Sequence, residues 1–319
     1  MVCTLMMAYS EVFFTIIAIK YNTSMQLNIS NLSKTYTNGV KAIRNVSLSL
    51  NEGMFGLLGP NGAGKSSLMR TIATLQEADE GSVQLDDIDV LKQKTEVRQL
   101  LGYLPQEFGV YPKISAEQML DHIAKLKGVS NSSERKELVS YLLDKVNLHK
   151  DRRKNLGTYS GGMKQRFGIA QALMGKPRLI IVDEPTAGLD PAERNRFYNL
   201  LSEIGQNTIV ILSTHIVEDV STLCSRFAII CEGEVLFSGT PADAIQQLNG
   251  KIFSKVIPKQ ELEIYKKGHN VISTQLKAGE LSIRVLSESN PQDGFMQVYP
   301  DLEDVYFTSI GSRVDINTI

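Results

Sequence analysis

The sequence has few cysteines, no surplus of charge of one sign and no long apolar run. The three cysteines, Cys3, Cys224 and Cys231, form no CxxC pair and lack zinc-ligand spacing, so we interpret them as reduced thiols of a cytosolic protein. Lysine and arginine number 34 against 35 aspartates and glutamates, which argues against a broad basic face for nucleic acid. No run reaches the roughly 18 apolar residues that span a bilayer.

The most apolar stretch is the N-terminal segment, residues 1–24. Glu11 lies near its centre, and the segment lacks the basic region and the small-residue cleavage site of a signal peptide. Three interpretations compete: a segment that touches a membrane, an atypical signal, and a tail upstream of the true start. We favour the tail, because a strand pattern follows Met25 at once, and we then expect residues 1–24 to lie outside the fold.

Short apolar segments alternate with helical patterns along most of the chain. From residue 26 to residue 50 polar and apolar residues alternate, with Val46, Leu48 and Leu50 on one face, as in antiparallel strands covered on one side. Later apolar runs are continuous, which is typical of strands buried on both faces of a parallel sheet. These runs span residues 54–59, 179–183, 208–214 and 227–230. Helical patterns separate them, so we predict a doubly wound α/β core in residues 25–245.

Two further regions differ from this core. Helical patterns at residues 117–128 and 136–146 indicate a helix-rich region, about residues 107–175, that lies apart from the sheet. Residues 246–319 predict a small C-terminal α+β domain, marginal as an independent fold, in which Asp301 caps the last helix. The expected strands of this domain span 251–257, 270–276, 280–286 and 295–299, and its helices span 259–267 and 301–307.

The segment "GPNGAGKSS" follows a predicted strand and precedes a helical pattern. It matches G-x-x-x-x-G-K-[ST], in the strand–loop–helix context that a P-loop requires. The glycines let the backbone amides wrap around phosphate oxygens, Lys65 supplies a positive charge, and the Ser66 hydroxyl group is placed to ligate Mg²⁺. The predicted phosphate site consists of Gly59, Pro60, Asn61, Gly62, Ala63, Gly64, Lys65, Ser66 and Ser67.

Two adjacent carboxylates end the apolar run in "RLIIVDEP". Asp183 follows the run as a Mg²⁺-positioning carboxylate does in P-loop NTPases, and Glu184 comes next. Consecutive residues that leave a strand point in different directions. We therefore predict that Asp183 holds the metal while Glu184 faces an attacking water as a general base.

A third pattern lies in "LGTYSGGMKQRFGIAQAL", where Ser160, Gly161 and Gly162 open a predicted helix. A helix N-terminus presents unpaired N–H groups and the positive end of a dipole, so it favours an anion. No other part of a phosphate site lies close to it in the sequence.

With these motifs in this order, residues 25–245 resemble the nucleotide-binding subunit of an ABC transporter. The family signature L-S-G-G-Q stands here as "YSGGM", with Tyr159 and Met163 replacing leucine and glutamine. The resemblance implies a P-loop NTPase fold of ABC type: a mostly parallel core sheet with an antiparallel β subdomain and a helical subdomain. It also implies that Ser160, Gly161 and Gly162 bind the γ-phosphate of an ATP held by a second subunit.

The resemblance assigns the remaining site residues one at a time. Tyr36 takes the position that stacks on adenine, a contact worth about 1–3 kcal/mol. Gln106 corresponds to the glutamine that reaches Mg²⁺ and the attacking water, and Asp190 to the residue that crosses the dimer interface. His215 corresponds to the switch histidine near the γ-phosphate, and it follows an apolar strand where α/β sheets place ligands.

The function implied is an ATP-hydrolysing subunit that binds ATP and Mg²⁺, forms a homodimer and powers a separate membrane permease from the cytoplasmic face of the cell membrane. The C-terminal domain resembles that of stand-alone ATPases of exporters. The alternatives are a soluble ABC ATPase of DNA repair or translation and a P-loop kinase or GTPase. The single P-loop, the absence of heptads and CxxC pairs, and the "YSGGM" and "STH" motifs favour the transporter subunit, with no nucleic acid as partner.

Overall fold

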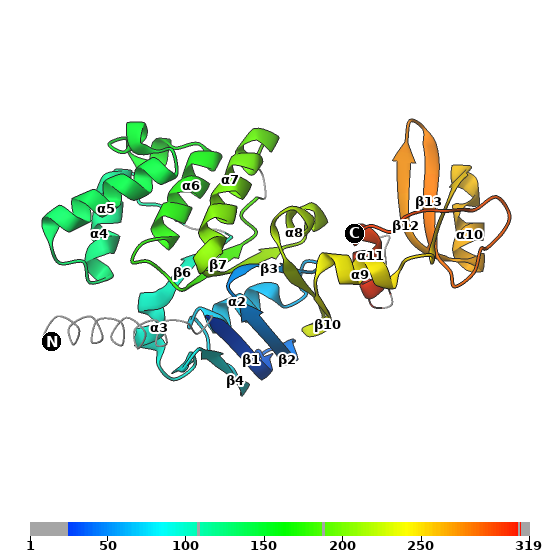
Figure 1. Ribbon diagram of the computed structural model, residues 1–319, viewed down its shortest axis with the longest axis horizontal. Coiled ribbons are helices and arrows are strands. Elements are labelled where there is room, and N and C mark those ends of the chain that lie inside the picture. Colours follow the sequence, from blue (N-terminus) through cyan, green and yellow to red (C-terminus); the bar gives the residue numbers. More distant parts are fainter. Residues whose placement is uncertain (1–24, 107–108, 187–188, 312, 314–319) are drawn as a thin grey trace, which may run out of the picture.

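The computed structural model describes residues 25–106, 109–186, 189–311 and 313. It contains three sheets with helices around them (Figure 1). The predicted N-terminal extension, residues 1–24, lies outside the described residues, as do residues 187 and 188 of "AGLDP". Within the described ranges, no helix combines the length and the apolar character that crossing a membrane requires.

The first sheet is antiparallel, as the alternating pattern predicted. Its strands run in the order β2-β1-β4-β5. Val46, Leu48 and Leu50 of the second strand are buried, and they pack in the same apolar cluster as the core sheet. The strands are β1 (Gln26–Thr35), β2 (Lys41–Asn51), β4 (Glu80–Leu85) and β5 (Ile88–Asp89).

The second sheet is the core of the nucleotide-binding unit. Its order is β10-β9-β3-β8-β7-β6, and every pairing is parallel except that of β9 with β10. The four predicted apolar runs all form strands of this sheet, which confirms the α/β class. The strands are β3 (Gly53–Leu58), β6 (Leu101–Leu104), β7 (Leu179–Asp183), β8 (Ile209–Thr214), β9 (Arg226–Cys231) and β10 (Glu234–Gly239).

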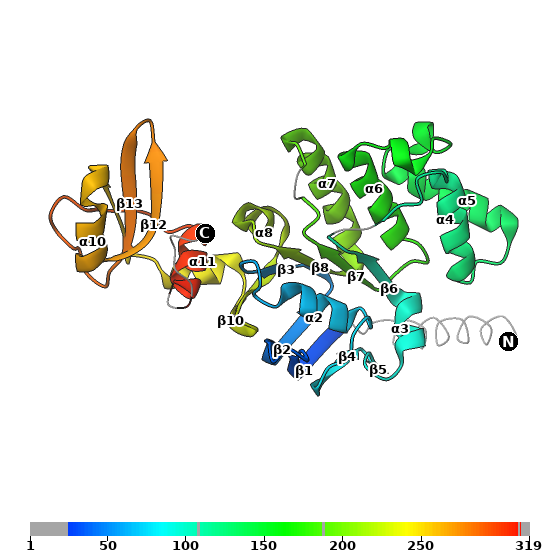
Figure 2. The same ribbon diagram turned by 180° about the vertical axis from the view of Figure 1, so that it is seen from behind.

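Helices cover both faces of this core sheet (Figure 2). The face that carries Phe55 and Leu57 packs with α2, α3 and the first sheet, and the other face, with Leu58 and Val182, packs with α7, α8 and α9. These helices are α2 (Lys65–Ile72), α3 (Lys94–Leu100), α7 (Pro191–Ile204), α8 (Val217–Leu223) and α9 (Pro241–Gln247).

A group of helices lies to one side of the core sheet, where the sequence predicted a helix-rich region (Figure 1). Ser115 caps α4 in a capping box with Gln118, and Asn131 caps α5. Lys127 joins this region to the core, because its ammonium group donates to the carbonyls of Arg98 and Leu101 at 2.6 and 2.9 Å. The elements are α4 (Ala116–Leu126), α5 (Ser132–Lys145), η1 (His149–Asp151), η2 (Leu156–Thr158) and α6 (Gly161–Ala172).

The third sheet lies at the opposite end of the molecule (Figure 1). Its order is β12-β13-β11-β14, all antiparallel, and its own small apolar cluster includes Phe253, Ile283 and Phe295. The predicted strand at 295–299 is only two residues long. The elements are β11 (Ile252–Ile257), η4 (Lys259–Glu261), α10 (Leu262–Gly268), β12 (Asn270–Lys277), β13 (Glu280–Leu286), β14 (Met296–Gln297) and α11 (Leu302–Ile310).

The last helix returns to the core of the nucleotide-binding unit. Asp301 caps α11, as predicted, in a capping box with Asp304. Val305, Tyr306 and Ile310 belong to the large apolar cluster that contains strand β9 and helix α9, not to the cluster of the third sheet. The C-terminal residues are thus anchored on the main body by this helix.

Candidate functional site

The phosphate loop connects strand β3 to helix α2. Gly62 and Gly64 have φ of +78° and +102°, a region that favours glycine. A Cβ atom on Gly64 would lie 2.2 Å from the carbonyl oxygen of Ala42, and one on Gly59 would lie 2.2 Å from that of Ile230. Both conformation and close packing therefore require glycine in this loop, as the P-loop motif predicts.

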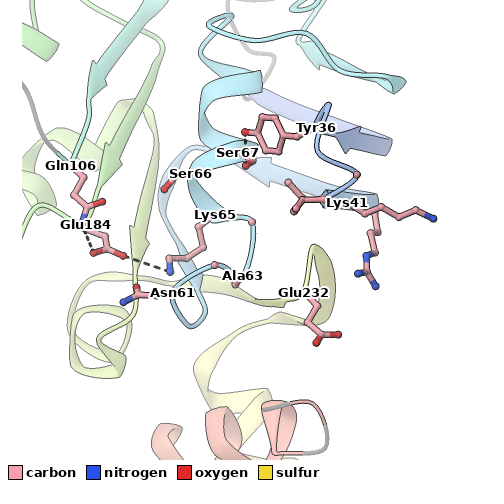
Figure 3. A pocket seen from close by; sticks show the side chains of 16 residues that line it. Tyr36, Lys41, Asn61, Ala63, Lys65, Ser66, Ser67, Gln106, Glu184 and Glu232 are labelled. Carbon is pink, nitrogen blue, oxygen red and sulfur yellow. Dashed lines mark hydrogen bonds and ion pairs between the residues drawn. The ribbon is translucent and has the colours of Figure 1, made fainter. Parts of the chain in front are cut away.

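The loop borders the cavity shown in Figure 3, which has a volume of about 820 Å³. Most predicted P-loop residues, from Asn61 to Ser67, line this cavity, together with Tyr36, Gln106 and Glu184. Gly59 and Pro60 do not line it, and their carbonyl groups accept hydrogen bonds from Lys65. Six further lining residues were not assigned to the site from the sequence, namely Gly39, Val40, Lys41, Ala42, Arg44 and Glu232.

The Lys65 side chain is buried at the first turn of α2. Its ammonium group donates to the carbonyls of Gly59 at 2.6 Å and Pro60 at 3.0 Å, and it lies 3.6 Å from Glu184 Oε1. Burial lowers the pKa of Lys65, and the carboxylates of Glu184 and Asp183 partly offset this effect. The cation is thus held close to the loop by two backbone carbonyl groups and the Glu184 carboxylate.

Glu184 is the centre of the polar contacts at the edge of the cavity. It follows β7 with a φ of +48°, and its N–H donates to the carbonyl of Ser213 at 2.9 Å. This turn separates its side chain from that of Asp183. Gln106 Nε2 donates to Glu184 Oε2 at 3.1 Å, and His215 Nδ1 lies 3.3 Å from Glu184 Oε1 (Figure 3 shows the Gln106 and Lys65 contacts). The structure therefore brings Lys65, Gln106, Glu184 and His215 together.

Asp183 ends strand β7 and is 3 % exposed. Its Oδ1 atom is buried and has no hydrogen-bond partner, and the same holds for the Ser213 hydroxyl oxygen on the adjacent strand. Unpartnered buried oxygens are costly, and hard oxygen ligands suit Mg²⁺. Among the described residues, no cluster of three or more His, Cys, Asp or Glu side chains could hold a metal by itself. The donor set thus fits an ion that takes the rest of its ligands from a bound phosphate and water.

Tyr36 follows strand β1 at the rim of the cavity. Its hydroxyl group lies 3.0 Å from Ser67 Oγ and donates to Gln76 Oε1 at 3.0 Å. Gln76 Nε2 in turn donates to the Ser67 carbonyl and to Thr71 Oγ1, both at 2.8 Å. The hydroxyl end of the Tyr36 ring is therefore fixed to helix α2 and Gln76. The contribution of Gln76 was not predicted from the sequence.

The "YSGGM" segment lies outside the cavity, at the start of helix α6. Ser160 is exposed and its hydroxyl group caps the helix by accepting from the Met163 N–H at 3.2 Å. The tyrosine in place of leucine is buried, and its hydroxyl group donates to the Asp151 carbonyl at 3.0 Å. Burial raises the pKa of Tyr159 to about 12. The substitution at Tyr159 therefore fills the core and leaves the exposed helix end unchanged.

Asp190 also lies at a helix start that is separate from the cavity. It caps α7 by accepting from the Glu193 N–H at 2.9 Å. Glu193 pairs with Arg166 of helix α6, and its carboxylate packs against Gly162. The N-termini of α6 and α7 thus form one exposed edge, which the chain does not bring to its own P-loop.

A buried carboxylate next to the site was not predicted. Asp219, four residues after His215, is 0 % exposed and accepts hydrogen bonds from Thr186, Tyr198 and Thr214. Helix α8 is short and the sequence showed no clear period for it. The sequence feature that could have indicated burial of Asp219 is the apolar residue directly after it in "EDV".

The fold and the site together define a P-loop nucleotide-binding protein of the α/β class. Comparison with known proteins makes this specific, because the sequence profile of the ABC transporter family matches residues 43–187. The chain is 37 % identical over 227 residues to the linearmycin resistance ATP-binding protein LnrL of Bacillus subtilis, covering 70 % of this chain and 72 % of that one. It is 33 % identical to the doxorubicin resistance ATP-binding protein DrrA of Mycobacterium tuberculosis, covering 75 % and 72 % of the two chains. The chain belongs to the ATP-binding proteins of ABC transporters, and it is an ATPase.

Solved structures support the same assignment. An ATP-binding cassette captured as a dimer in a post-hydrolysis state, bound to ADP and Pi, superposes with a TM-score of 0.62 at 27 % identity. The match covers 67 % of this chain and 98 % of the cassette. The expected ABC-type fold is therefore confirmed, with additional residues beyond the cassette.

Proposed function

We propose that this chain powers an ABC exporter: two copies close around two ATP molecules and drive a separate membrane permease. The observation that carries the proposal is the convergence of Lys65, Gln106 and His215 on Glu184 beside the P-loop cavity. Export is favoured because two relatives carry resistance names, for linearmycin and for doxorubicin. Selectivity for the transported compound would reside in the permease.

In this proposal each cavity takes one ATP. The P-loop amides and Lys65 bind the phosphates, and a phosphate replaces the carbonyls of Gly59 and Pro60 as the partner of the lysine. The Tyr36 ring stacks on adenine. Ser66, Asp183 and Gln106 are the residues that would hold Mg²⁺, which neutralises phosphate charge when bound. The unpartnered Asp183 Oδ1 supports this choice.

Glu184 is the proposed general base for the attacking water. Its carboxylate is already oriented by three side chains, and its location beside Lys65 supports a role at the γ-phosphate. His215, which follows strand β8, lies 3.3 Å from Glu184 Oε1, so it can contact the γ-phosphate and keep Glu184 in place.

The second subunit would complete the site. Ser160, Gly161, Gly162 and Asp190 lie on an exposed edge away from the cavity, as expected of groups that serve the partner's ATP. The N-terminus of α6 offers free N–H groups and a positive dipole end to a γ-phosphate. Both halves then bind the same anion, so its hydrolysis releases the dimer.

The proposed location is the cytoplasmic face of the cell membrane, with the permease contacting the surface beside Gln106.

We also propose the division into an ATP-binding domain, residues 25–245, and an accessory domain, residues 246–319. The separate apolar cluster of the third sheet supports this division, and the packing of α11 in the large cluster supports attachment of the accessory domain to the ATP-binding domain.

The decisive variant is Glu184→Gln. It should bind ATP, hydrolyse it about 10²- to 10⁴-fold more slowly, and accumulate as an ATP-dependent dimer in light scattering. Lys65→Ala is the matched control, because it should lose nucleotide affinity and remain monomeric. A Glu184→Gln protein that stays monomeric in saturating ATP would contradict the dimer mechanism, and unchanged affinity in Lys65→Ala would contradict the phosphate site.

The transporter assignment has its own test. Glu184→Gln protein is expressed in its native cell, membranes are solubilised gently, and the proteins that co-purify in ATP are identified. A polytopic membrane protein would support the permease partner. Ribosomes or DNA-bound complexes alone would leave the ATPase chemistry intact and assign the chain to a soluble ABC system.

A further inference from the structure

Asp219 is a fully buried carboxylate whose side-chain hydrogen-bond partners among the described residues are all hydroxyl groups. It lies in the first turn of helix α8 and is 0 % exposed. Its Oδ2 atom accepts from Thr214 Oγ1 at 2.6 Å and from Thr186 Oγ1 at 2.8 Å, and its Oδ1 atom accepts from the Tyr198 hydroxyl group. Burying a charge is costly unless it is hydrogen-bonded, and these three hydroxyl groups offset that cost. We call them the cage of Asp219.

Two of these hydroxyl groups stand next to the proposed catalytic side chains. Thr214 ends strand β8 and directly precedes His215. Thr186 follows Glu184 by two residues, on the segment that leaves strand β7. One carboxylate oxygen therefore links the segment that carries the proposed base with the segment that carries the proposed γ-phosphate histidine. Glu184 Oε1 and His215 Nδ1 lie only 3.3 Å apart, a contact that small shifts of either segment would break.

The third hydroxyl group, that of Tyr198, connects helix α7 to Asp219. Tyr198 is buried and lies on this helix, whose N-terminus is capped by Asp190. Thr214 has a further link, since its oxygen accepts from the Ile216 N–H at 3.0 Å. The segments after β7 and β8 and the helix that begins at Asp190 thus share one anchor.

We propose that Asp219 is a positioning residue for ATP hydrolysis, which fixes Glu184 and His215 relative to each other through Thr186 and Thr214. An ionised carboxylate only accepts, so both of its oxygens can face donors at once, and charge-assisted bonds are about twice as strong as neutral ones. An amide at this position would present N–H donors to two of the hydroxyl groups, which would have to accept instead of donate, and its hydrogen bonds would be neutral and not charge-assisted. The inference rests on the proposed roles of Glu184 and His215.

The first test compares Asp219→Asn with wild type. We expect kcat to fall about 10- to 100-fold, the range for slight misplacement of catalytic groups, while KM for MgATP stays within about twofold because the P-loop is unchanged. Glu218→Gln, a change at the exposed neighbouring acid, is the matched control and should leave both constants near wild type. An inactive wild type would refute the proposed function, whereas an active wild type with an unchanged Asp219→Asn kcat would refute only this inference.

Combination with Glu184→Gln separates positioning from a general loss of structure. If Asp219 acts through Glu184, adding Asp219→Asn to Glu184→Gln should reduce the residual rate by no more than about twofold. A further loss as large as that in wild type would mean that Asp219 serves the fold alone.

Thr186 provides a variant pair that keeps the proposal testable if Asp219→Asn does not fold. Thr186→Ser retains the hydroxyl group and should keep several-fold more kcat than Thr186→Val, which has the same shape without it, at equal ATP affinity. Equal kcat in the two variants would overturn the proposal.

Discussion

Gln76 shows how a residue outside the nucleotide motifs can control one inside them. Its amide fixes the Tyr36 hydroxyl group and is itself fixed by Ser67 and Thr71. We predict that Gln76→Met, which keeps the volume and removes these bonds, weakens ATP binding about 2- to 12-fold, the equivalent of about 0.5–1.5 kcal/mol for one hydrogen bond. The affinity is measured by equilibrium titration with ATP.

Tyr36→Phe is the control for this prediction. It retains the stacking ring and loses the hydroxyl group, so it should show a similar loss, and the double variant should lose little more. If Gln76→Met bound ATP as tightly as wild type, the orientation of the ring would not depend on this network.

At the same scale, the sequence predicted the P-loop far better than it predicted Asp219. The loop is contiguous in the sequence, so its motif can be read directly. In the structure, a positive φ or a carbonyl close in space explains why each of its glycines is required. The partners of Asp219 lie 33, 21 and 5 residues away, and only the fold brings them together. A buried acid beside an acidic neighbour in "VEDV" looks like the solvated first turn of a helix.

At the scale of elements, Asp121 and Arg135 join helices α4 and α5. Asp121 Oδ1 lies 2.9 Å from Arg135 Nε, and Asp121 Oδ2 lies 2.9 Å from Lys125 Nζ. Hydrogen bonds from Lys125 and then Arg135 hold the pKa of Asp121 below its ordinary value of 3.8. A carboxyl group whose pKa is lower in the folded state stabilises the fold above its unfolded pKa, and this contribution disappears as pH falls through the folded pKa.

We therefore predict that Asp121→Asn lowers the unfolding free energy at pH 7 and that its difference from wild type shrinks below pH 3.8. Urea unfolding of both proteins, followed by circular dichroism at several pH values, measures this difference. Asp144→Asn removes an exposed carboxylate from α5 and is the control, with an expected change within about 0.5 kcal/mol. A difference that stayed constant down to acidic pH would show that ionisation of Asp121 does not matter.

Elements with strong patterns were predicted and weak ones were missed. The continuous runs gave β3, β7, β8 and β9, because strands buried on both faces contain little else than apolar residues. Strand β10 is half-buried along its length, so it shows neither a continuous run nor a clean alternation. Strand β6 has only four residues, and its pairing with β7 depends on contacts that the sequence does not display.

At the scale of the whole molecule, the α/β class followed from the alternation of strands and helices, but the core that the last helix joins did not. The last helix was predicted as part of the accessory domain. In the structure, α11 packs on α8, α9, β9 and β10 and also contacts strand β12 of the third sheet, while Arg284 of that sheet pairs with its buried Asp304. A sequence pattern indicates which face of a helix is apolar, but it does not indicate in which of two apolar cores that face is buried.

This packing predicts that the end of the chain stabilises the ATP-binding part. Ile310 is 0 % exposed in the large apolar cluster, so Ile310→Ala should cost about 2–5 kcal/mol and lower the thermal midpoint of the transition that ATP protects. Leu276→Ala, at a 63 % exposed leucine of the third sheet, is the control and should change stability by less than about 0.5 kcal/mol. Scanning calorimetry with and without ATP distinguishes the two parts of the chain. If Ile310→Ala left the ATP-protected transition unchanged, α11 would contribute only to the third sheet, and the two parts would be energetically independent.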